Sequence, residues 1–398
     1  MTTSRSVCPP AAMLAAALAV LIVAALSLVA RPKPAEAATL QEVTGFGTNP
    51  GNLRMFRHVP TDLPAGRPLV VALHGCTQNA AGYGPGSGWI QLADQWKFSV
   101  LIPEQKQANN ANSCFNWFEP GDTRRDSGEA LSLKQMVDRM RQDLGSTSAH
   151  VSGLSAGGAM AAVMLATYPE VFAGGGVVAG LPFGCATTVA SAYNCMNPGV
   201  NLTPAQWGDK VRAATAYSSE RAKVSIWHGS ADGTVRPMNG VELVEQWTNV
   251  VGTDQVPEVR DMVAGYPHRV YGGMVEIYDV TGMGHGHPVD PGSGDTHCGT
   301  AGSYMLDVNI CASYHMARFW GLVSNSPTPT STPTPAPTST STPPYAEVVN
   351  GTATDHYVAG RVNVSEYNVL GARYGYNTVF ALYRCGSGWT DKSDCSPI

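Results

Sequence analysis

The sequence predicts an α/β fold, a mostly parallel β-sheet with helices on both faces, followed by a small C-terminal α+β module. Short apolar segments that fit buried strands alternate along the chain with longer segments of helical periodicity. Of the 398 residues, 43% are hydrophobic and only 14% are charged, so most of the chain can bury a core. This composition excludes a fully disordered or coiled-coil protein.

Five segments are predicted to be buried strands because they are short, apolar and bounded by Gly or polar residues. They are residues 68–73, 98–102, 175–178, 224–227 and 275–280. Helices are predicted between and after them, at residues 90–96, 128–144, 158–167, 241–250 and 312–320. In a sheet of this type, catalytic groups gather beyond the carboxyl ends of the strands. Functional residues are therefore expected in the loops that follow these strands.

Residues 1–37 are predicted to be a signal peptide. Arg5 gives the segment a positive start, residues 11–30 form an apolar run, and Ala35-Glu36-Ala37 has the small-x-small pattern that a signal peptidase accepts. A retained membrane anchor is the alternative, because the apolar run approaches the ~20 residues that span a bilayer. We expect a secreted, extracellular protein that has no contact with the membrane after cleavage.

Eight cysteines remain once Cys8 leaves with the leader, an even number that suits an oxidising compartment. Eight cysteines permit ~105 pairings, but short spacings favour one set. That set is Cys185 with Cys195, Cys298 with Cys311, Cys385 with Cys395 and, by remainder, Cys76 with Cys114. The chain has no C-x-x-C spacing among them, so a structural zinc site or a redox pair is not expected.

Residues 324–344 are rich in Pro, Thr and Ser and contain no large apolar side chain. This composition predicts an extended spacer. The chain is thereby divided into a leader, a body at 38–323, the spacer and a tail module at 345–398. The formal net charge is −5 and there is no basic run, so nucleic acid is not an expected partner.

Gly153-Leu154-Ser155-Ala156-Gly157 matches G-x-S-x-G, the turn that lifts a serine hydroxyl between a strand and a helix. Residues 149–153 can enter the turn as a strand, and the Ala-, Met- and Leu-rich segment from Gly158 can leave it as a helix. A plain Gly-rich turn is the alternative. We interpret Ser155 as a nucleophile.

A serine hydroxyl needs an imidazole to take its proton and an acid to orient that imidazole. Asp232 lies in a loop after the strand 224–227, and His285 lies in a loop after the strand 275–280. The order Ser, acid, His along the chain is the order that accompanies this turn. The sequence therefore predicts Ser155, Asp232 and His285 as a catalytic triad.

Other residues compete for these roles. The acid has four rivals, of which Asp279 lies within a strand and the others lack the strand-then-loop setting: Asp261, Asp279, Asp290 and Asp295. His287 is the alternative base, while His228 is predicted to be a structural histidine that hydrogen-bonds its loop. A metal cluster is a further alternative, because imidazoles and carboxylates gather at His285, His287, Asp290, Asp295 and His297. We expect neither a metal nor a cofactor.

The chemistry also requires backbone donors for the oxyanion of a tetrahedral intermediate. The amide of Ala156 is one candidate, and the loop at residues 73–78 after an earlier strand should supply the other. The alternative for His74-Gly75 is a simple strand-ending turn. A bond from Cys76 to Cys114 would keep this loop rigid.

Several long motifs together resemble the secreted polyhydroxyalkanoate (PHB) depolymerase esterases. They are Leu73-His-Gly-Cys-Thr-Gln78, Asn109-Asn-Ala-Asn-Ser-Cys-Phe-Asn-Trp-Phe118, Gly153-Leu-Ser-Ala-Gly-Gly158 and Gly282-Met-Gly-His285. The resemblance implies an α/β-hydrolase with the triad named above and with the amides of Cys76 and Ala156 as oxyanion hole. It also implies an aromatic substrate wall at Trp117, with Trp89 as a second candidate; a place in the core is the alternative for both.

Two features depart from the family pattern. The strand before the turn, at residues 148–152, is shorter and less apolar than usual, and His287 stands where many relatives have a smaller or apolar residue. The same family contains feruloyl and acetylxylan esterases, so the resemblance does not fix the substrate.

The tail module is rich in aromatic residues, with eight among its 54 residues. They are expected to form a thin core and an exposed apolar face. Asn363-Val-Ser-Glu366 predicts a capping box for a helix, followed by a strand at 378–383. The motifs His356-Tyr-Val-Ala-Gly-Arg361 and Gly375-Tyr-Asn-Thr378 resemble the polymer-binding modules of PHB depolymerases.

The expected function is that of a secreted serine esterase acting on poly(3-hydroxybutyrate), an insoluble polyester. The first alternative is a feruloyl or acetylxylan esterase acting on cell-wall polysaccharide. The second is a binding protein of adhesin type that has lost catalysis.

Overall fold

The computed structural model describes residues 1–2, 40–323, 347–358, 361–362, 364–374, 378–385, 388–392 and 395. The predicted leader and spacer therefore lie almost entirely outside the described residues. Among the residues that are described, no helix has the length and apolar character needed to cross a membrane.

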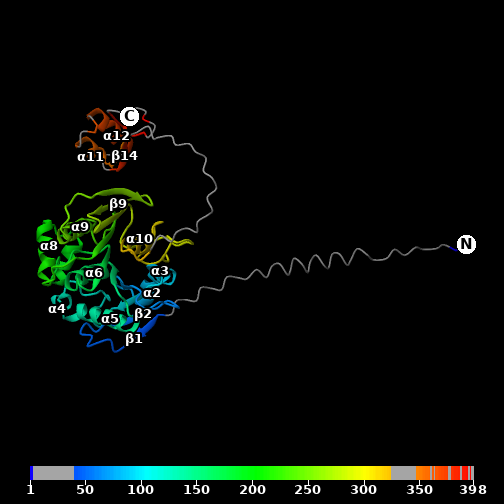
Figure 1. Ribbon diagram of the computed structural model, residues 1–398, viewed down its shortest axis with the longest axis vertical. Helices are drawn as coiled ribbons and strands as arrows, with labels where there is room; N and C mark the ends of the chain where they lie inside the picture. Colours follow the sequence, from blue (N-terminus) through cyan, green and yellow to red (C-terminus); the bar gives the residue numbers. More distant parts are fainter. Residues whose placement is uncertain are drawn as a thin grey trace. The chain divides into compact units, whose positions relative to one another are not determined.

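The described part of the body contains one ten-stranded sheet with a parallel centre and antiparallel edges (Figure 1). Six neighbouring strands are parallel, in the order β4-β3-β5-β6-β7-β10. The strands in spatial order are β1 (Gln41–Val43), β2 (Arg54–His58), β4 (Ser99–Glu104), β3 (Leu69–Leu73), β5 (Ala149–Leu154), β6 (Phe172–Val178), β7 (Lys223–Gly229), β10 (Val275–Val280), β9 (Tyr266–Tyr271) and β8 (Val259–Val263). The mostly parallel sheet that the sequence predicted is thus confirmed.

The antiparallel edge strands were not predicted, because their side chains do not form buried apolar runs. In β8, for example, the residues are exposed except for the last, which is half-buried. The strand before the serine turn also differs from expectation. All six residues of β5 are buried, so its weakly apolar sequence still forms a central strand.

Helices cover both faces of the sheet. They are α2 (Ala80–Gly86), α3 (Trp89–Trp96), α4 (Pro120–Thr123), α5 (Gly128–Leu144), α6 (Ala156–Thr167), α7 (Val189–Met196), α8 (Pro204–Ala213), α9 (Met238–Val251) and α10 (Ala312–Phe319). Successive residues of a strand point to opposite faces. On β6, a Cβ at Gly175 would meet Leu165 of α6, whereas a Cβ at Gly176 would meet Met316 of α10. These two helices therefore lie on opposite faces.

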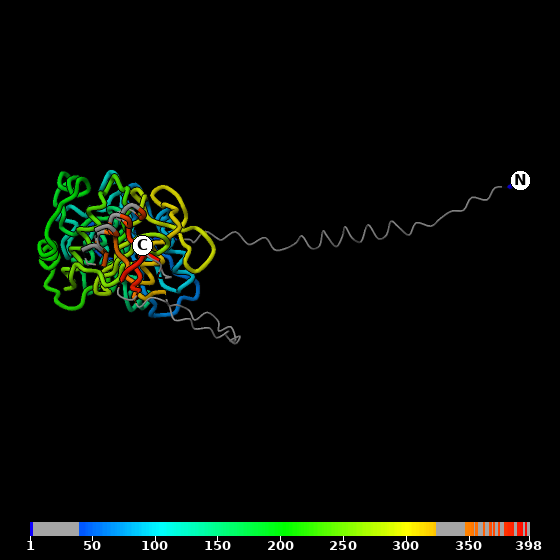
Figure 2. Tube along the Cα trace, turned by 90° about the horizontal axis from the view of Figure 1, so that it is seen from above, coloured from blue at the N-terminus to red at the C-terminus, as the bar shows by residue number. Residues whose placement is uncertain are grey.

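The helix that follows the serine turn is the centre of the core. Every residue of α6 is buried, and most are Ala, Gly or Met. Small side chains allow the helix to approach the sheet closely, so α6 is held on all sides. Two short strands form a separate sheet outside the ten-stranded one. They are β11 (His287–Val289) and β12 (Met305–Asp307), which pair in parallel and lie in the segment that is yellow in Figure 2.

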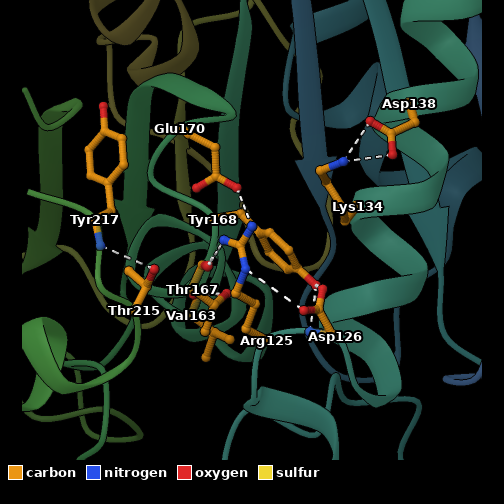
Figure 3. A network of polar contacts seen from close by, with 10 residues as sticks. All are labelled: Arg125, Asp126, Lys134, Asp138, Val163, Thr167, Tyr168, Glu170, Thr215 and Tyr217. Atoms are coloured by element: carbon orange, nitrogen blue, oxygen red, sulfur yellow. Dashed lines mark hydrogen bonds and ion pairs between the residues drawn. The ribbon is translucent and has the colours of Figure 1, made fainter. Parts of the chain in front are cut away.

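Arg125 fastens the far end of α6 (Figure 3). Its guanidinium donates to the carbonyl of Thr167 over 2.8 Å and pairs with Glu170 at 2.6 Å. It also lies 4.7 Å from the ring centre of Tyr168, whose hydroxyl accepts from the amide of Asp126. A cation at a helix C-terminus donates to an unpaired carbonyl and interacts favourably with the negative end of the helix dipole.

The tail module has its own small core. Its antiparallel sheet has the order β13 (Glu347–Gly351), β14 (Phe380–Cys385), β15 (Gly388–Thr390), and its helices are α11 (Ala353–Val358) and α12 (Val364–Tyr374). The predicted helix and strand are both present. Asn363 of the predicted capping box lies outside the described residues. Leu370 and Leu382 are fully buried, and Tyr367, Phe380 and Trp389 pack against that core.

Replacing Arg125 by Ala should lower the free energy of unfolding by about 1–2 kcal/mol, because a charged hydrogen bond to a helix end and a partly exposed ion pair are lost together. Lys134→Ala is the matched control: this lysine pairs with Asp138 on the exposed side of α5 (Figure 3), and its loss should cost no more than about 0.5 kcal/mol. Denaturant unfolding measures both. Equal effects of the two substitutions would contradict the role of Arg125.

Candidate active site

The turn between β5 and α6 places Ser155 in an unusual backbone conformation, with φ 57° and ψ −119°. Neighbouring glycines make this turn possible. A Cβ at Gly153 would lie 2.3 Å from the backbone of Gly157, and a Cβ at Gly157 would lie 2.2 Å from the carbonyl oxygen of Leu73. Neither contact is sterically possible, so only glycine fits at both positions. The turn presses the start of α6 against the end of β3 and leaves the serine hydroxyl exposed to the loops above.

The structure brings the three predicted triad residues together. The Nε2 atom of His285 lies 3.0 Å from the Oγ atom of Ser155, and its Nδ1 atom lies 2.7 Å from Oδ2 of Asp232. The three side chains follow β5, β7 and β10, which are parallel strands whose carboxyl ends lie at the same edge of the sheet. The geometry allows His285 to accept the serine proton while its other nitrogen donates to the carboxylate.

Asp232 is buried and its carboxylate is well supplied with donors. Its Oδ1 atom accepts from the amides of Thr234 and Val235, each over 2.9 Å. Burial by itself would raise the pKa of Asp232, but the bonds from His285 and from these two amides outweigh it and bring the pKa below its ordinary value. The acid is therefore ionised at neutral pH and can stabilise an imidazolium.

His228 supports the acid loop, as the sequence predicted. It is buried, its Nε2 lies 2.8 Å from the carbonyl oxygen of Val235, and burial lowers its pKa. A neutral ring that donates to this carbonyl holds the turn that presents Asp232.

The rival residues are engaged elsewhere. His287 is fully buried, its Nε2 lies 3.1 Å from the hydroxyl of Ser313, and burial lowers its pKa to about 3. It is a core histidine that also stands edge-on to Tyr83. Each of the alternative acids has its own partner: Asp261 with His268, Asp279 with Arg269, Asp290 with His297, and Asp295 with Gln95.

The residues considered as metal ligands do not converge on one point. His285 and His287 face different partners, Ser155 and Ser313, and His297 pairs with Asp290 at 2.9 Å. Within the described ranges, no group of three or more His, Cys, Asp or Glu side chains is arranged to hold a metal ion.

The two residues predicted as oxyanion donors lie in the two segments that border the serine turn. Ala156 is the first residue of α6, so its amide has no acceptor within the helix. The loop after β3 approaches from the other side: a Cβ at Gly75 would lie 3.4 Å from the carbonyl oxygen of Leu154. Cys76, the next residue, lines the same cavity as Ser155.

A cavity of about 380 Å³ opens above the triad and contains no Asp, Glu, Lys or Arg. Ser155 and His285 lie among its walls. The remaining lining residues are Gly75, Cys76, Thr77, Gln78, Asn110, Asn112, Cys114, Trp117, Phe118, Leu154, Val189, Ala192, Tyr193, Met196, Thr234 and Tyr304. Mostly apolar walls with a few amide and hydroxyl groups suit an uncharged ligand.

The structure places the two predicted wall residues differently, and the prediction for Trp89 needs correction. Trp117 lines the cavity, with its edge against Phe118. Trp89 does not line it. It is fully buried and stacks on Trp320 at 5.6 Å, with Phe98 at its edge, so it belongs to the core. The sequence could not separate these two tryptophans, because both have apolar neighbours along the chain.

Two disulfides hold the cavity walls. Cys76–Cys114 joins the loop after β3 to the segment that carries Trp117, and Cys185–Cys195 closes the loop that leads into α7. With Cys298–Cys311 and Cys385–Cys395, these are the four predicted pairs, three of them predicted from short spacing and Cys76–Cys114 by remainder.

A buried polar network, which no sequence pattern predicts, lies next to the segment that carries Trp117. The carboxyl group of Glu129, at the start of α5, accepts from Nε2 of Gln105 over 2.5 Å and from the amide of Asn116 over 2.9 Å. The backbone amide of Gln105 donates to Nε2 of the His74 ring over 3.1 Å. The network thus joins both sides of the cavity. An acidic residue in a first helical turn gives no sign of burial, because such residues are usually solvated.

Comparisons with known proteins assign the chain to a family. The family described as esterase PHB depolymerase matches residues 59–262. Poly(3-hydroxyalkanoate) depolymerase C from Paucimonas lemoignei is 56% identical over 378 residues, covering 90% of this chain and 91% of that protein. The chain belongs to the PHB depolymerase esterase family. It is accordingly a carboxylic ester hydrolase.

Two other proteins that are similar to this chain are named for other esters. Feruloyl esterase B from Thermothelomyces thermophilus is 35% identical, covering 63% of this chain and 89% of that protein. The solved structure of an acetyl xylan esterase from Aspergillus awamori has a TM-score of 0.62 and 29% identity, covering 72% of this chain and all of that one. The α/β-hydrolase fold expected from the resemblance is confirmed.

Glu129→Gln should lower the free energy of unfolding by about 1–3 kcal/mol, because an amide NH₂ would face one of the two donors and leave it unpaired. We also expect KM for a soluble ester to rise more than kcat falls, since the wall at Trp117 loosens while the triad stays in place. Asp138→Asn, on the exposed face of the same helix, is the control: it should lower the free energy of unfolding by no more than about 0.5 kcal/mol and leave KM unchanged. An unchanged KM in Glu129→Gln would contradict the positioning role.

The same substitution should change the pH dependence of stability. Burial, together with the nearby Asp122, raises the pKa of Glu129 to about 8. The pKa of Glu129 is higher in the folded state than in the unfolded state. Its contribution to the free energy of unfolding is therefore complete below the unfolded value, near 4.5, and is lost as pH rises toward 8. This part of the pH profile should be absent from Glu129→Gln.

Proposed function

We propose that this protein is a secreted serine esterase that hydrolyses a short-chain polyhydroxyalkanoate, poly(3-hydroxybutyrate), through an acyl-enzyme. The observation that supports this proposal most strongly is the 56% identity to the Paucimonas lemoignei depolymerase across 90% of the chain. This share of the chain is larger than residues 38–323 alone make up. The match therefore extends beyond the body. The feruloyl esterase, by contrast, matches only 63% of the chain.

In this proposal, Ser155 is the nucleophile, His285 the general base and acid, and Asp232 the residue that orients the imidazole. The Oγ atom attacks the ester carbonyl while Nε2 of His285 takes its proton, over the 3.0 Å that separates them. The imidazolium is stabilised by the buried Asp232 carboxylate at 2.7 Å. It then protonates the departing alcohol, and the acyl group remains on Ser155.

The second half of the reaction repeats these roles with water. His285 takes a proton from a water molecule that attacks the acyl-enzyme, and returns it to Ser155 as the acid product leaves. In both halves the tetrahedral oxyanion would be held by the amides of Cys76 and Ala156, each worth ~3–4 kcal/mol in the transition state. These positions are supported by the place of both residues beside Ser155.

The uncharged cavity supports a neutral, weakly polar ester as the group that is cleaved. Trp117 and Phe118 offer apolar surface, and Asn110 and Asn112 offer amide donors to ester oxygens. A feruloyl or acetylxylan ester is the second candidate, favoured by the 35% identity to feruloyl esterase B and by the aromatic walls, which can also receive a ring.

The remaining parts of the chain fit an extracellular enzyme for a solid substrate. We assign residues 1–37 to a signal peptide, 38–323 to the catalytic domain, 324–344 to a spacer and 345–398 to a polymer-binding module. The four disulfides suit the oxidising conditions outside the cell. A binding module on a spacer keeps the catalytic domain at high local concentration over an insoluble surface.

The decisive experiment compares substrates with the full chain. Clearing of a poly(3-hydroxybutyrate) suspension should far exceed the release of ferulate or acetate from cell-wall material. Ser155→Ala is the control and should lose at least about 10⁴-fold in rate, together with labelling by a fluorophosphonate. Faster release from cell-wall material would favour the second candidate. Activity retained by Ser155→Ala would exclude the serine mechanism, and an unlabelled wild-type protein would point to a binding protein.

A chain that ends at residue 323 tests the division into two domains. We expect it to hydrolyse soluble esters at the rate of the full chain but to clear the polymer suspension at least about 10-fold more slowly, because it lacks the tether. Full-length Ser155→Ala should still sediment with the polymer. Equal clearing by both lengths of chain would contradict a binding role for residues 345–398.

A further inference from the structure

A second hollow, of about 490 Å³, lies next to the catalytic cavity. Gln78 lines both hollows, so they are neighbours across a single side chain. One wall is formed by Ala81, Gly82 and Pro85 of α2, the other by residues 300–303, and Met305 also lines it. We call this hollow the trough. The wall at residues 300–303 belongs to a segment that is yellow in Figure 2.

The two walls of the trough are joined to each other. The amide of Thr300 donates to the carbonyl of Gly86 over 3.0 Å, which closes one end. At the end near the cavity, Nε2 of Gln78 lies 3.5 Å from the carbonyl oxygen of Ser303. Gly302 and Met305 exchange two backbone hydrogen bonds of 3.0 Å, so the loop has a fixed shape. The trough is therefore formed before any ligand arrives.

The chemistry of the trough fits an aliphatic ester chain. Its lining contains no charged side chain and no aromatic ring. The small side chains of Ala81, Pro85 and Ala301 give a shallow apolar surface, while Thr300 and Ser303 offer hydroxyl donors. Methyl and methylene groups can pack on the first set, and ester carbonyls can accept from the second. A polysaccharide would find none of the flat rings on which sugars stack.

We propose that the trough is a subsite that binds polyester units beyond those held in the catalytic cavity, with Gln78 between the two. The proposal rests on the proposed polyester substrate. A polymer cleaved within its length must continue away from the triad, and the trough adjoins the cavity across the side chain of Gln78. Gln78 also accepts from the amide of Gly75 over 2.9 Å, next to the Cys76 oxyanion position. A chain that lies across Gln78 thus passes beside the reacting ester.

Gly302 allows the trough to be blocked without disturbing the fold. A Cβ at this position meets no atom within 4 Å, and the backbone is not in the left-handed region. Gly302→Phe should therefore place a ring in the trough. Gly121→Phe is the matched control, because Gly121 also has open space around its Cβ and lines neither hollow. Ala301→Phe, on the same exposed wall, is a second blocking variant.

The measurement is kcat/KM for a short p-nitrophenyl ester, a hydroxybutyrate dimer and longer hydroxybutyrate oligomers. We expect both blocking variants to act on the short ester and the dimer as the wild type does, and to lose at least about 10-fold on the longer oligomers. Gly121→Phe should match the wild type on all three. The same melting temperature in all variants confirms that they are folded.

Two outcomes would overturn the trough as a subsite. One is a wild-type rate on long oligomers in both blocking variants; the other is an equal loss on short and long substrates. A third result would show that the proposed polyester activity itself is wrong. If the wild type cleaves cell-wall esters but no hydroxybutyrate oligomer of any length, that activity fails, and the trough proposal fails with it.

Discussion

The close approach of backbone to backbone at the start of α6 is the contact on which the site depends. Gly153 and Gly157 leave no room for a Cβ, and Gly157 rests on the carbonyl of Leu73. This contact fixes three things at once: the strained conformation of Ser155, the free amide at the first residue of the helix, and the distance from the helix to the loop after β3. Any side chain at these glycines would separate the elements that must meet around one ester carbonyl.

The rest of the site is positioned by buried polar groups whose bonds are satisfied. Asp232 is held by two amides and by His285, and His228 holds the carbonyl at the end of the same turn. A buried carboxylate without these donors would become protonated and could not stabilise an imidazolium. On the cavity wall, Glu129 holds the segment that carries Trp117 by accepting from the amide of Asn116. The catalytic groups and the binding surface are thus both held from behind by hydrogen bonds that are shielded from water.

Much of this organisation can be predicted from residue patterns, because it depends on local order along the chain. The alternation of apolar strands and helices predicts the sheet, and G-x-S-x-G followed by an acid and a histidine in strand-end loops predicts which side chains meet. Short spacings predict three of the disulfides that the structure contains, and the fourth, Cys76–Cys114, follows as the remaining pair. The antiparallel edge strands escape prediction, since a strand that is exposed on one or both faces has no buried apolar run to reveal it.

The sequence by itself therefore determined the fold class, the candidate triad and its order, because backbone turns and strand ends are specified by short stretches of chain. Only the tertiary structure decided which of two tryptophans faces the cavity, that His287 belongs to the core, and that Glu129 is buried behind the wall. It alone also placed the trough beside the triad, through residues more than 200 positions apart at Gln78 and Ser303. The physical reason is that burial and cavity shape are set by contacts between distant segments, and no local pattern of residues encodes them.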